Sequence, residues 1–192
     1  VIKESCFNGS SEMVSQLATA ITTFLFNNIM MELLCENGVA AITIIIYSQF
    51  LLNTLYIGYS IGIAPVIGFN YGNKNDVQQK KVFRISMGFI AAASVLIFSV
   101  YMFGSSHIVR LFAEDTSEVY QIAANGFTIF SFSFLFCGLN NFTSAMFTAL
   151  SNGKVSAVLS FLRTFGLLAG GILLLPRIWG TTGVWMAVPI AE

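Results

Sequence analysis

The sequence predicts an all-α protein that crosses a membrane several times. Of its 192 residues, 56% are hydrophobic and 9% are charged, and the mean hydropathy is +0.78. A soluble domain carries about 25% charged residues, so this composition indicates a chain that lies in lipid. An open strand leaves backbone groups unsatisfied in hydrocarbon, and we therefore expect the apolar runs to be helices.

The charges divide the chain into long apolar segments. No Asp, Glu, Lys or Arg occurs in 37–73, 85–106, 119–153 or 178–191. A helix of about 20 residues crosses the hydrocarbon layer. The sequence therefore predicts helices at about 5–34, 39–69, 83–104, 122–150 and 154–175, with a partial one at 183–192. Both ends of 1–192 look cut, so we expect a fragment.

The second predicted helix, 39–69, is longer than a perpendicular span requires, and tilt or a break would accommodate the excess. Pro65 has three glycines near it, Gly58, Gly62 and Gly68. Proline removes a backbone donor and crowds the preceding turn. We therefore expect a hinge at Pro65.

The loops alternate in charge. The loop around 71–84 holds four basic residues and one acid, whereas the loop around 105–121 holds three acids and Arg110. Lysine and arginine mark the cytoplasmic side, which places the basic loop and the N-terminal end of the chain inside the cell. Within the acidic loop, the apolar residues Ile108, Val109, Leu111 and Phe112 suggest a short helix on the membrane surface.

A polar stripe runs along the first predicted helix. Its members follow one another at steps of four or three residues and so share one face: Glu12, Gln16, Thr19, Thr23 and Asn27. A carboxylate at the centre of a membrane helix costs about 2.5 kcal/mol or more, so it normally faces water, a partner or an ion. The alternative is that the span begins near Ser11 and Glu12 marks the interface.

Three further spans carry polar stripes. The second span has Gln49, Asn53, Tyr56 and Ser60; the fourth has Ser133, Cys137, either Asn140 or Asn141, Ser144 and Thr148; the fifth has Ser156, Ser160 and Arg163. Serine and threonine commonly bond membrane helices together. Asparagine, glutamine and a buried arginine favour a water-filled interior as well. The third span is poor in polar residues, and we expect it to face lipid.

Several function classes are disfavoured. A net charge of zero argues against nucleic acid as a partner. The three cysteines form no CxxC pair, and a single histidine, His107, excludes an HExxH metalloprotease. No Walker loop or Gly-x-Ser-x-Gly turn appears. We therefore expect no enzyme and no resident cofactor.

Five stretches together resemble the second half of the multidrug and toxic compound extrusion (MATE) transporters. They cover nearly the whole chain in order: NGSSE at 8–12, NGVAA at 37–41, GIAPVIGFNYG at 62–72, LFAED at 111–115 and GVWMAVPIAE at 183–192. The third stretch is the most specific. The first looks most like the MepA-like branch of the family.

The resemblance implies a twelve-helix transporter made of two six-helix lobes, of which this chain is the C-terminal one, with helices 7–11 and the start of 12. It implies secondary active efflux of cationic or amphipathic drugs by Na⁺ or H⁺ antiport, with alternating access between the lobes. The implied partners are such drugs, the N-terminal lobe and the lipid bilayer. The implied location is the bacterial cytoplasmic (inner) membrane.

The resemblance also implies site residues. Glu12 matches a coupling glutamate of the seventh helix, with a Na⁺ ion near it, and the position of a second acid falls on Asn140. An asparagine can coordinate sodium but cannot carry a proton. Glu12 is then the only expected carboxylate of the cavity, lined by the polar stripes and Arg163. Arg163 either balances Glu12 there or has a structural role towards the cytoplasm.

Two alternatives to efflux stay open. A lipid-linked oligosaccharide flippase of the same superfamily would need several cations to hold a pyrophosphate, and only Arg163 qualifies. A non-transporting membrane scaffold would have no need of Glu12.

Overall fold

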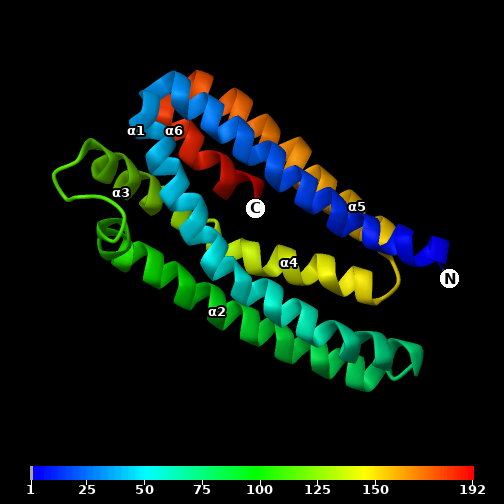
Figure 1. The fold of residues 1–192 in the computed structure, drawn as a ribbon. Coiled ribbons are helices and arrows are strands. Elements are labelled where there is room, and N and C mark those ends of the chain that lie inside the picture. Colours follow the sequence, from blue (N-terminus) through cyan, green and yellow to red (C-terminus); the bar gives the residue numbers. More distant parts are fainter. Residues whose placement is uncertain (1) are drawn as a thin grey trace.

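The computed structural model describes the backbone of residues 2–192 and the side chains of residue 13 and residues 16–192. The described chain is helical and holds no strand, which confirms the prediction of an all-α protein. The elements are α1 (Ile2–Gly72), α2 (Asp76–Arg110), α3 (Glu118–Ser131), α4 (Phe134–Ala149), α5 (Gly153–Phe161), the π-helix η1 (Leu162–Ala169) and α6 (Gly170–Ala191) (Figure 1).

Long apolar helices make this a multi-pass membrane protein. Three helical stretches among the described residues are long and apolar enough to cross a membrane: Gln16–Gly72, Asp76–Arg110 and Gly153–Ala191. Helices α3 and α4 meet at a bend of 55° and can form a fourth span as a pair. By length and composition, the described residues therefore supply three or four membrane spans.

Two sharp turns fold helices back on themselves. Within α1, Cys35 has φ 52° and ψ −145°, and within α6, Gly180 has φ 56° and ψ −135°. At each turn the chain reverses direction with almost no loop (Figure 1). Both reversals lie at the same end of the molecule, where Asn37 Nδ2 also donates a 2.7 Å hydrogen bond to Glu118 Oε2 at the start of α3.

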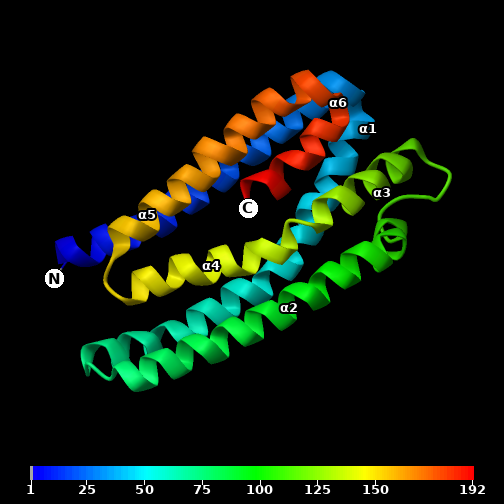
Figure 2. The same cartoon turned by 180° about the vertical axis from the view of Figure 1, so that it is seen from behind.

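The reversals produce two arms with further helices between them (Figures 1 and 2). The first half of α1 runs beside α5 in one arm, and its second half runs beside α2 in the other. Helix α4 packs against α1, α2 and α5, and the last turns of α6 point back into the space between the arms. This arrangement brings the end of α6 towards α4.

Side-chain caps start two of the helices. Asn75 Oδ1 accepts a 3.1 Å hydrogen bond from the amide of Gln78 and begins α2, and Ser117 Oγ accepts a 3.2 Å bond from the amide of Tyr120 and begins α3. Such caps satisfy amides that lack an intrahelical partner. They fix where the two loops between helices end.

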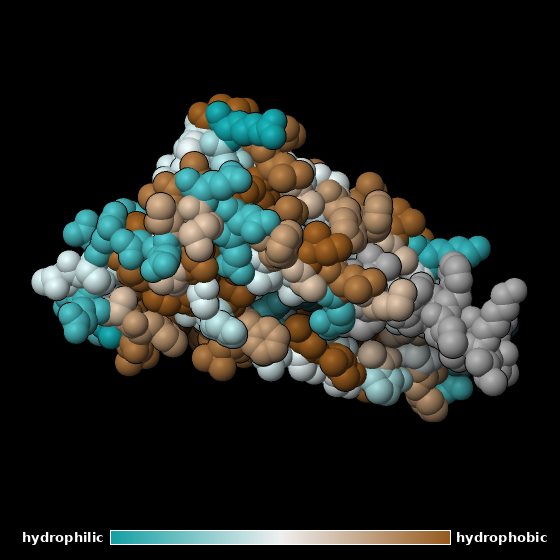
Figure 3. All heavy atoms as spheres, turned by 45° about the horizontal axis from the view of Figure 1, so that its top comes forward, coloured by the Kyte–Doolittle hydropathy of each residue, from teal (hydrophilic) through white to brown (hydrophobic). Residues whose placement is uncertain are grey.

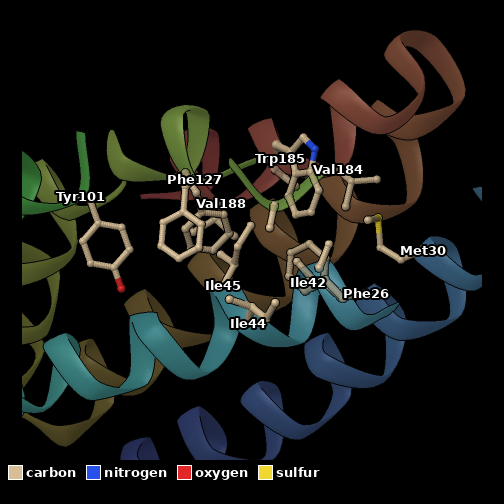
Figure 4. Close-up of a cluster of buried hydrophobic side chains, with 14 of the residues drawn as sticks. Phe26, Met30, Ile42, Ile44, Ile45, Tyr101, Phe127, Val184, Trp185 and Val188 are labelled. Carbon is tan, nitrogen blue, oxygen red and sulfur yellow. The ribbon is translucent and has the colours of Figure 1, made fainter. Parts of the chain in front are cut away.

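The main hydrophobic core lies beside the two reversals and joins α1, α2, α3, α4 and α6 (Figure 4). Its buried side chains include Phe26, Met30, Ile42, Ile44, Ile45, Tyr101, Phe127, Val184, Trp185 and Val188. Outside the core, hydrophobic residues cover much of the face shown in Figure 3, and hydrophilic ones gather most densely at its left side. Lipid-facing apolar surface is expected of a spanning protein.

Helix α2 is only partly a lipid-facing helix. Large apolar side chains such as Val95, Leu96 and Phe103 are exposed, as predicted for the third span. However, two of its serines face the bundle: Ser86 accepts a 3.0 Å hydrogen bond from Tyr59, and Ser94 accepts a 3.2 Å bond from Tyr56. Tyr56 therefore lies in the lobe interior, fully buried, and not in an open cavity.

Three local expectations differ from the structure. The chain breaks between α3 and α4 at Phe132 and Ser133, where one helix was expected over 122–150. The backbone of α1 keeps helical angles at Pro65, so no static break occurs there. Residues 108–112 form no separate helix, because α2 continues to Arg110 and ends in a turn.

Candidate functional site

A polar cavity of about 310 Å³ lies between α4, α5, η1 and the end of α6. Its walls carry four leucine or alanine side chains and six polar ones: Asn140, Thr143, Ser144, Ser160, Arg163 and Glu192. A pocket with an apolar wall and a few convergent polar groups is the usual form of a small-molecule site. We therefore take this cavity as the candidate site.

Glu192 is the centre of the polar groups in this cavity. The reversal at Gly180 directs the last turns of α6 towards α4, so that Asn140 Nδ2 donates 2.7 Å hydrogen bonds to both the carbonyl oxygen and Oε2 of Glu192. Arg163 Nη1 lies 3.2 Å from the same Oε2 and forms an ion pair with it. The two charged side chains are 11% and 26% exposed, for Glu192 and Arg163 respectively.

The ion pair corrects the expectation that Glu12 is the only carboxylate of the cavity. Glu192 is a carboxylate of this cavity, and it contacts two predicted site residues, Asn140 and Arg163. An uncompensated charge in a partly dry site is costly, and pairing reduces that cost. The arginine is thus neutralised by Glu192, a partner that the sequence-based reasoning did not consider.

Arg163 is the second residue of the π-helix η1. A π-helix is wider than an α-helix, and such segments often occur at functional sites. Of the eight residues of η1, Leu162, Arg163 and Leu167 line the cavity. The irregular segment therefore forms one wall of the site.

The first polar stripe lies elsewhere. The side chain of Glu12, and with it the predicted Na⁺ site, lies outside the described residues. Gln16 and Thr19 are exposed, Thr23 is half-buried, and Asn27 is half-buried with its Oδ1 atom enclosed and without a hydrogen-bond partner. None of these four side chains lines the 310 Å³ cavity.

Other predicted cavity residues bond helices to one another. Asn141 Nδ2 donates a 2.9 Å hydrogen bond to Asn53 Oδ1, which also accepts from Cys137 Sγ at 3.4 Å. These contacts join α4 to the second half of α1. Gln49 is half-buried on the same helix and does not line the cavity.

Hydroxyl groups join α4 to α5 in the same way. Ser144 Oγ lies 2.7 Å from Ser156 Oγ and 3.3 Å from Ser160 Oγ, and Thr148 donates to Ser156 at 3.1 Å. Ser144 and Ser160 also line the cavity. The stripes of the fourth and fifth spans thus supply both contacts between helices and parts of a cavity wall.

The described residues contain no group of three or more His, Cys, Asp or Glu side chains that could hold a metal ion. Within the described part of the chain, an ion at Glu192 would meet one carboxylate together with neutral oxygens. Suitable neighbours are the side-chain oxygen of Asn140 and the hydroxyls of the cavity wall, because hard cations such as Na⁺ accept oxygen ligands of these kinds.

The chain matches the family model described as MatE over residues 13–169. No curated protein matches it. Among solved structures, it is similar to an outward-facing multidrug resistance MATE family transporter of the MOP superfamily, with a TM-score of 0.86 and 22% identity over 95% of this chain and 41% of that one. It is also similar to a mutant of the Vibrio cholerae MATE transporter VcmN, with a TM-score of 0.88 and 20% identity over 96% of this chain and 42% of that one.

A third similar structure is a MOP superfamily transporter from Pyrococcus furiosus, whose reversed pocket polarity is said to suggest a different function. Its TM-score is 0.86 at 21% identity, over 95% of this chain and 41% of that one. At these identities the structural likeness shows the fold alone. The chain spans about two fifths of the length of the solved transporters that it matches.

Proposed function

The chain belongs to the MatE family, and on that premise we propose that it is one lobe of a secondary active transporter that expels cationic or amphipathic small molecules. The other lobe would complete the substrate cavity, and Na⁺ or H⁺ moving inwards would drive efflux. The proposed location is the cytoplasmic membrane of a bacterium, with the basic loop inside the cell. The MepA-like branch remains a prediction.

The observation that carries this proposal is the ion pair between Arg163 and Glu192 inside the cavity. Ionisable groups within membrane spans are rare and typically mark ion or substrate pathways. Here the acid and the base share a pocket with further polar side chains from α4 and α5. A scaffold would gain little from such a pair, because a well-packed apolar pair is often equally stable.

Coupling follows from competition at a single carboxylate. Glu192 Oε2 accepts hydrogen bonds from both Asn140 and Arg163. A proton or a sodium ion that binds Glu192 must weaken its bond to Arg163, and a cationic substrate would compete for the same negative charge. Ion and substrate would therefore exclude each other, which is the requirement for antiport. Glu12 remains a proposed second coupling acid.

An oligosaccharide flippase is less well supported. Binding a pyrophosphate calls for several free cationic groups. Arg163 is the only cation among the residues that line the cavity, and Glu192 already neutralises it.

The test replaces single carboxylates in the complete transporter and measures efflux of a fluorescent cation such as ethidium from cells. We expect Glu192→Gln and Glu12→Gln each to abolish efflux at normal expression, because the amide carries no charge for the coupling ion. Glu114→Gln, in the loop between α2 and α3, is the matched control and should transport normally. Undiminished, ion-dependent efflux by Glu192→Gln would refute the assigned role.

A further inference from the structure

A second pocket, of about 660 Å³, lies at the opposite end of the lobe from the two chain reversals. It is formed where α1 ends, α2 begins and α4 ends, and Figure 1 draws these three ends together at the lower right. This is also the end that carries the basic loop. The polar cavity between α4 and α6 shares no lining residue with it.

One side of this pocket is cationic. Lys80 and Arg84 line it from successive turns of α2, and no acidic residue lines it. Residues four apart on a helix lie on one face, so the two positive charges repel each other unless an anion lies between them. Neither side chain has an ion-pair partner among the described residues. The charge pattern therefore favours an anionic ligand.

The other side of the pocket is apolar and flexible. Phe83 and Met87 of α2 line it together with Met146 of α4 and the adjacent Leu150. Methionine side chains adapt to irregular apolar ligands. A small free anion would leave this surface without a partner, whereas an acyl chain would cover it.

Two more groups indicate the polar part of the ligand. Gln79 Oε1 is enclosed and lacks a hydrogen-bond partner among the described residues, so the pocket has an acceptor for a ligand hydroxyl. Tyr71 also lines the pocket and is 54% exposed. Tyrosine is enriched at the level of lipid headgroups.

We propose that this pocket binds one anionic phospholipid with a hydroxyl-bearing headgroup, such as phosphatidylglycerol. The phosphate lies between Lys80 and Arg84, a headgroup hydroxyl donates to Gln79, and an acyl chain lies along Met87 and Met146. Basic pockets between membrane helices on the cytoplasmic side are suited to anionic headgroups. The lipid would link the basic loop, α2 and α4 in one leaflet.

The experiment titrates dioleoyl phosphatidylglycerol into the purified complete transporter in neutral detergent and follows the first bound lipid by native mass spectrometry. Lys80→Gln/Arg84→Gln removes two charges from the pocket. Lys74→Gln/Lys81→Gln removes two charges from the same loop, at positions that do not line the pocket. Met146→Trp instead fills the apolar side and keeps every charge.

We expect the Lys80/Arg84 variant to bind the lipid about 30-fold more weakly, from about 1 kcal/mol per basic group near an anionic lipid and 1.4 kcal/mol per factor of ten. Met146→Trp should also weaken binding, and the Lys74/Lys81 variant should stay within about threefold of the parent protein. Dioleoyl phosphatidylcholine should bind weakly to all of them.

Equal losses in the two charge variants would overturn the proposal, because they would indicate a diffuse attraction. Tight binding of glycerol 3-phosphate alone would overturn it too, because the ligand would then be a free phosphate. The assay needs no transport. Since Glu192→Gln leaves this pocket intact, lipid binding by that variant separates failure of this inference from failure of the proposed antiport.

Discussion

Replacing Cys35 by glycine should stabilise the protein. Cys35 turns α1 back on itself at φ 52° and ψ −145°, a conformation that side chains with a Cβ rarely adopt. The equivalent reversal in α6 has nearly the same angles and uses a glycine, Gly180. The comparison suggests that the first turn is strained by its side chain.

The size of the effect follows from two opposing terms. A non-glycine residue at positive φ costs about 1–3 kcal/mol in the folded state. Glycine loses about 0.5–1 kcal/mol more chain entropy on folding than alanine does. Cys35→Gly should therefore raise the free energy of unfolding by about 1 kcal/mol over Cys35→Ala. The alanine variant removes the exposed thiol and keeps the Cβ, so it isolates the backbone term.

The reciprocal change is Gly180→Ala. An added Cβ at Gly180 meets no atom within 4 Å, so no steric clash contributes and only the backbone penalty remains. We expect the variant to lose about 1 kcal/mol of stability.

The assay is unfolding of the complete transporter in mixed micelles by titration with a denaturing detergent, followed by tryptophan fluorescence. Trp185 in the main core reports directly on this end of the lobe. If Cys35→Gly proved no more stable than Cys35→Ala, strain at the turn would be excluded.

Three further substitutions test packing and hydrogen bonds with the same unfolding assay. Gly138→Ala should destabilise the protein by about 1–3 kcal/mol, because the added Cβ would approach a buried tyrosine ring on α1 to 2.5 Å. Gly88→Ala is the control and should not destabilise it, because an added Cβ there meets no atom within 4 Å. Asn53→Ala should cost about 0.6–1.7 kcal/mol because it removes the acceptor of Asn141, and leucine at both positions should recover most of the loss. Asp115→Asn should change the stability by less than about 1 kcal/mol, since its ion pair with an arginine is half exposed. A larger loss would show that this surface ion pair stabilises the fold.

Composition and the spacing of charges were sufficient to predict the fold class, because hydrocarbon excludes charge whatever the tertiary structure is. The reversal at Cys35 was not predicted as a strained turn, since the usual signal for such angles is a glycine. The break at Phe132 was equally hidden, because a run of phenylalanine and serine is compatible with a continuous helix.

The candidate site was predictable only in part. Asn140 and Arg163 were identified because amide and guanidinium groups are costly in lipid, and both line the cavity. Glu192 was missed because the reversal at Gly180 brings it to α4. No local sequence pattern in α6 predicts this contact. Tyr56 was placed on the polar stripe of the second span on spacing alone. In the structure its hydroxyl bonds to Ser94, a contact that depends on the packing of α2.

The two nearly loopless reversals also determine what a reagent outside the bilayer can reach. At that end of the lobe, the chain turns at Cys35 and at Gly180 with almost no loop. Among the described residues there, only the segment between Arg110 and Glu118 is a loop of several residues. Epitope tags, antibodies and proteases all require several residues of flexible chain. Topology mapping of this face should therefore place its insertion in 111–117, and insertions at the two reversals should disrupt the fold.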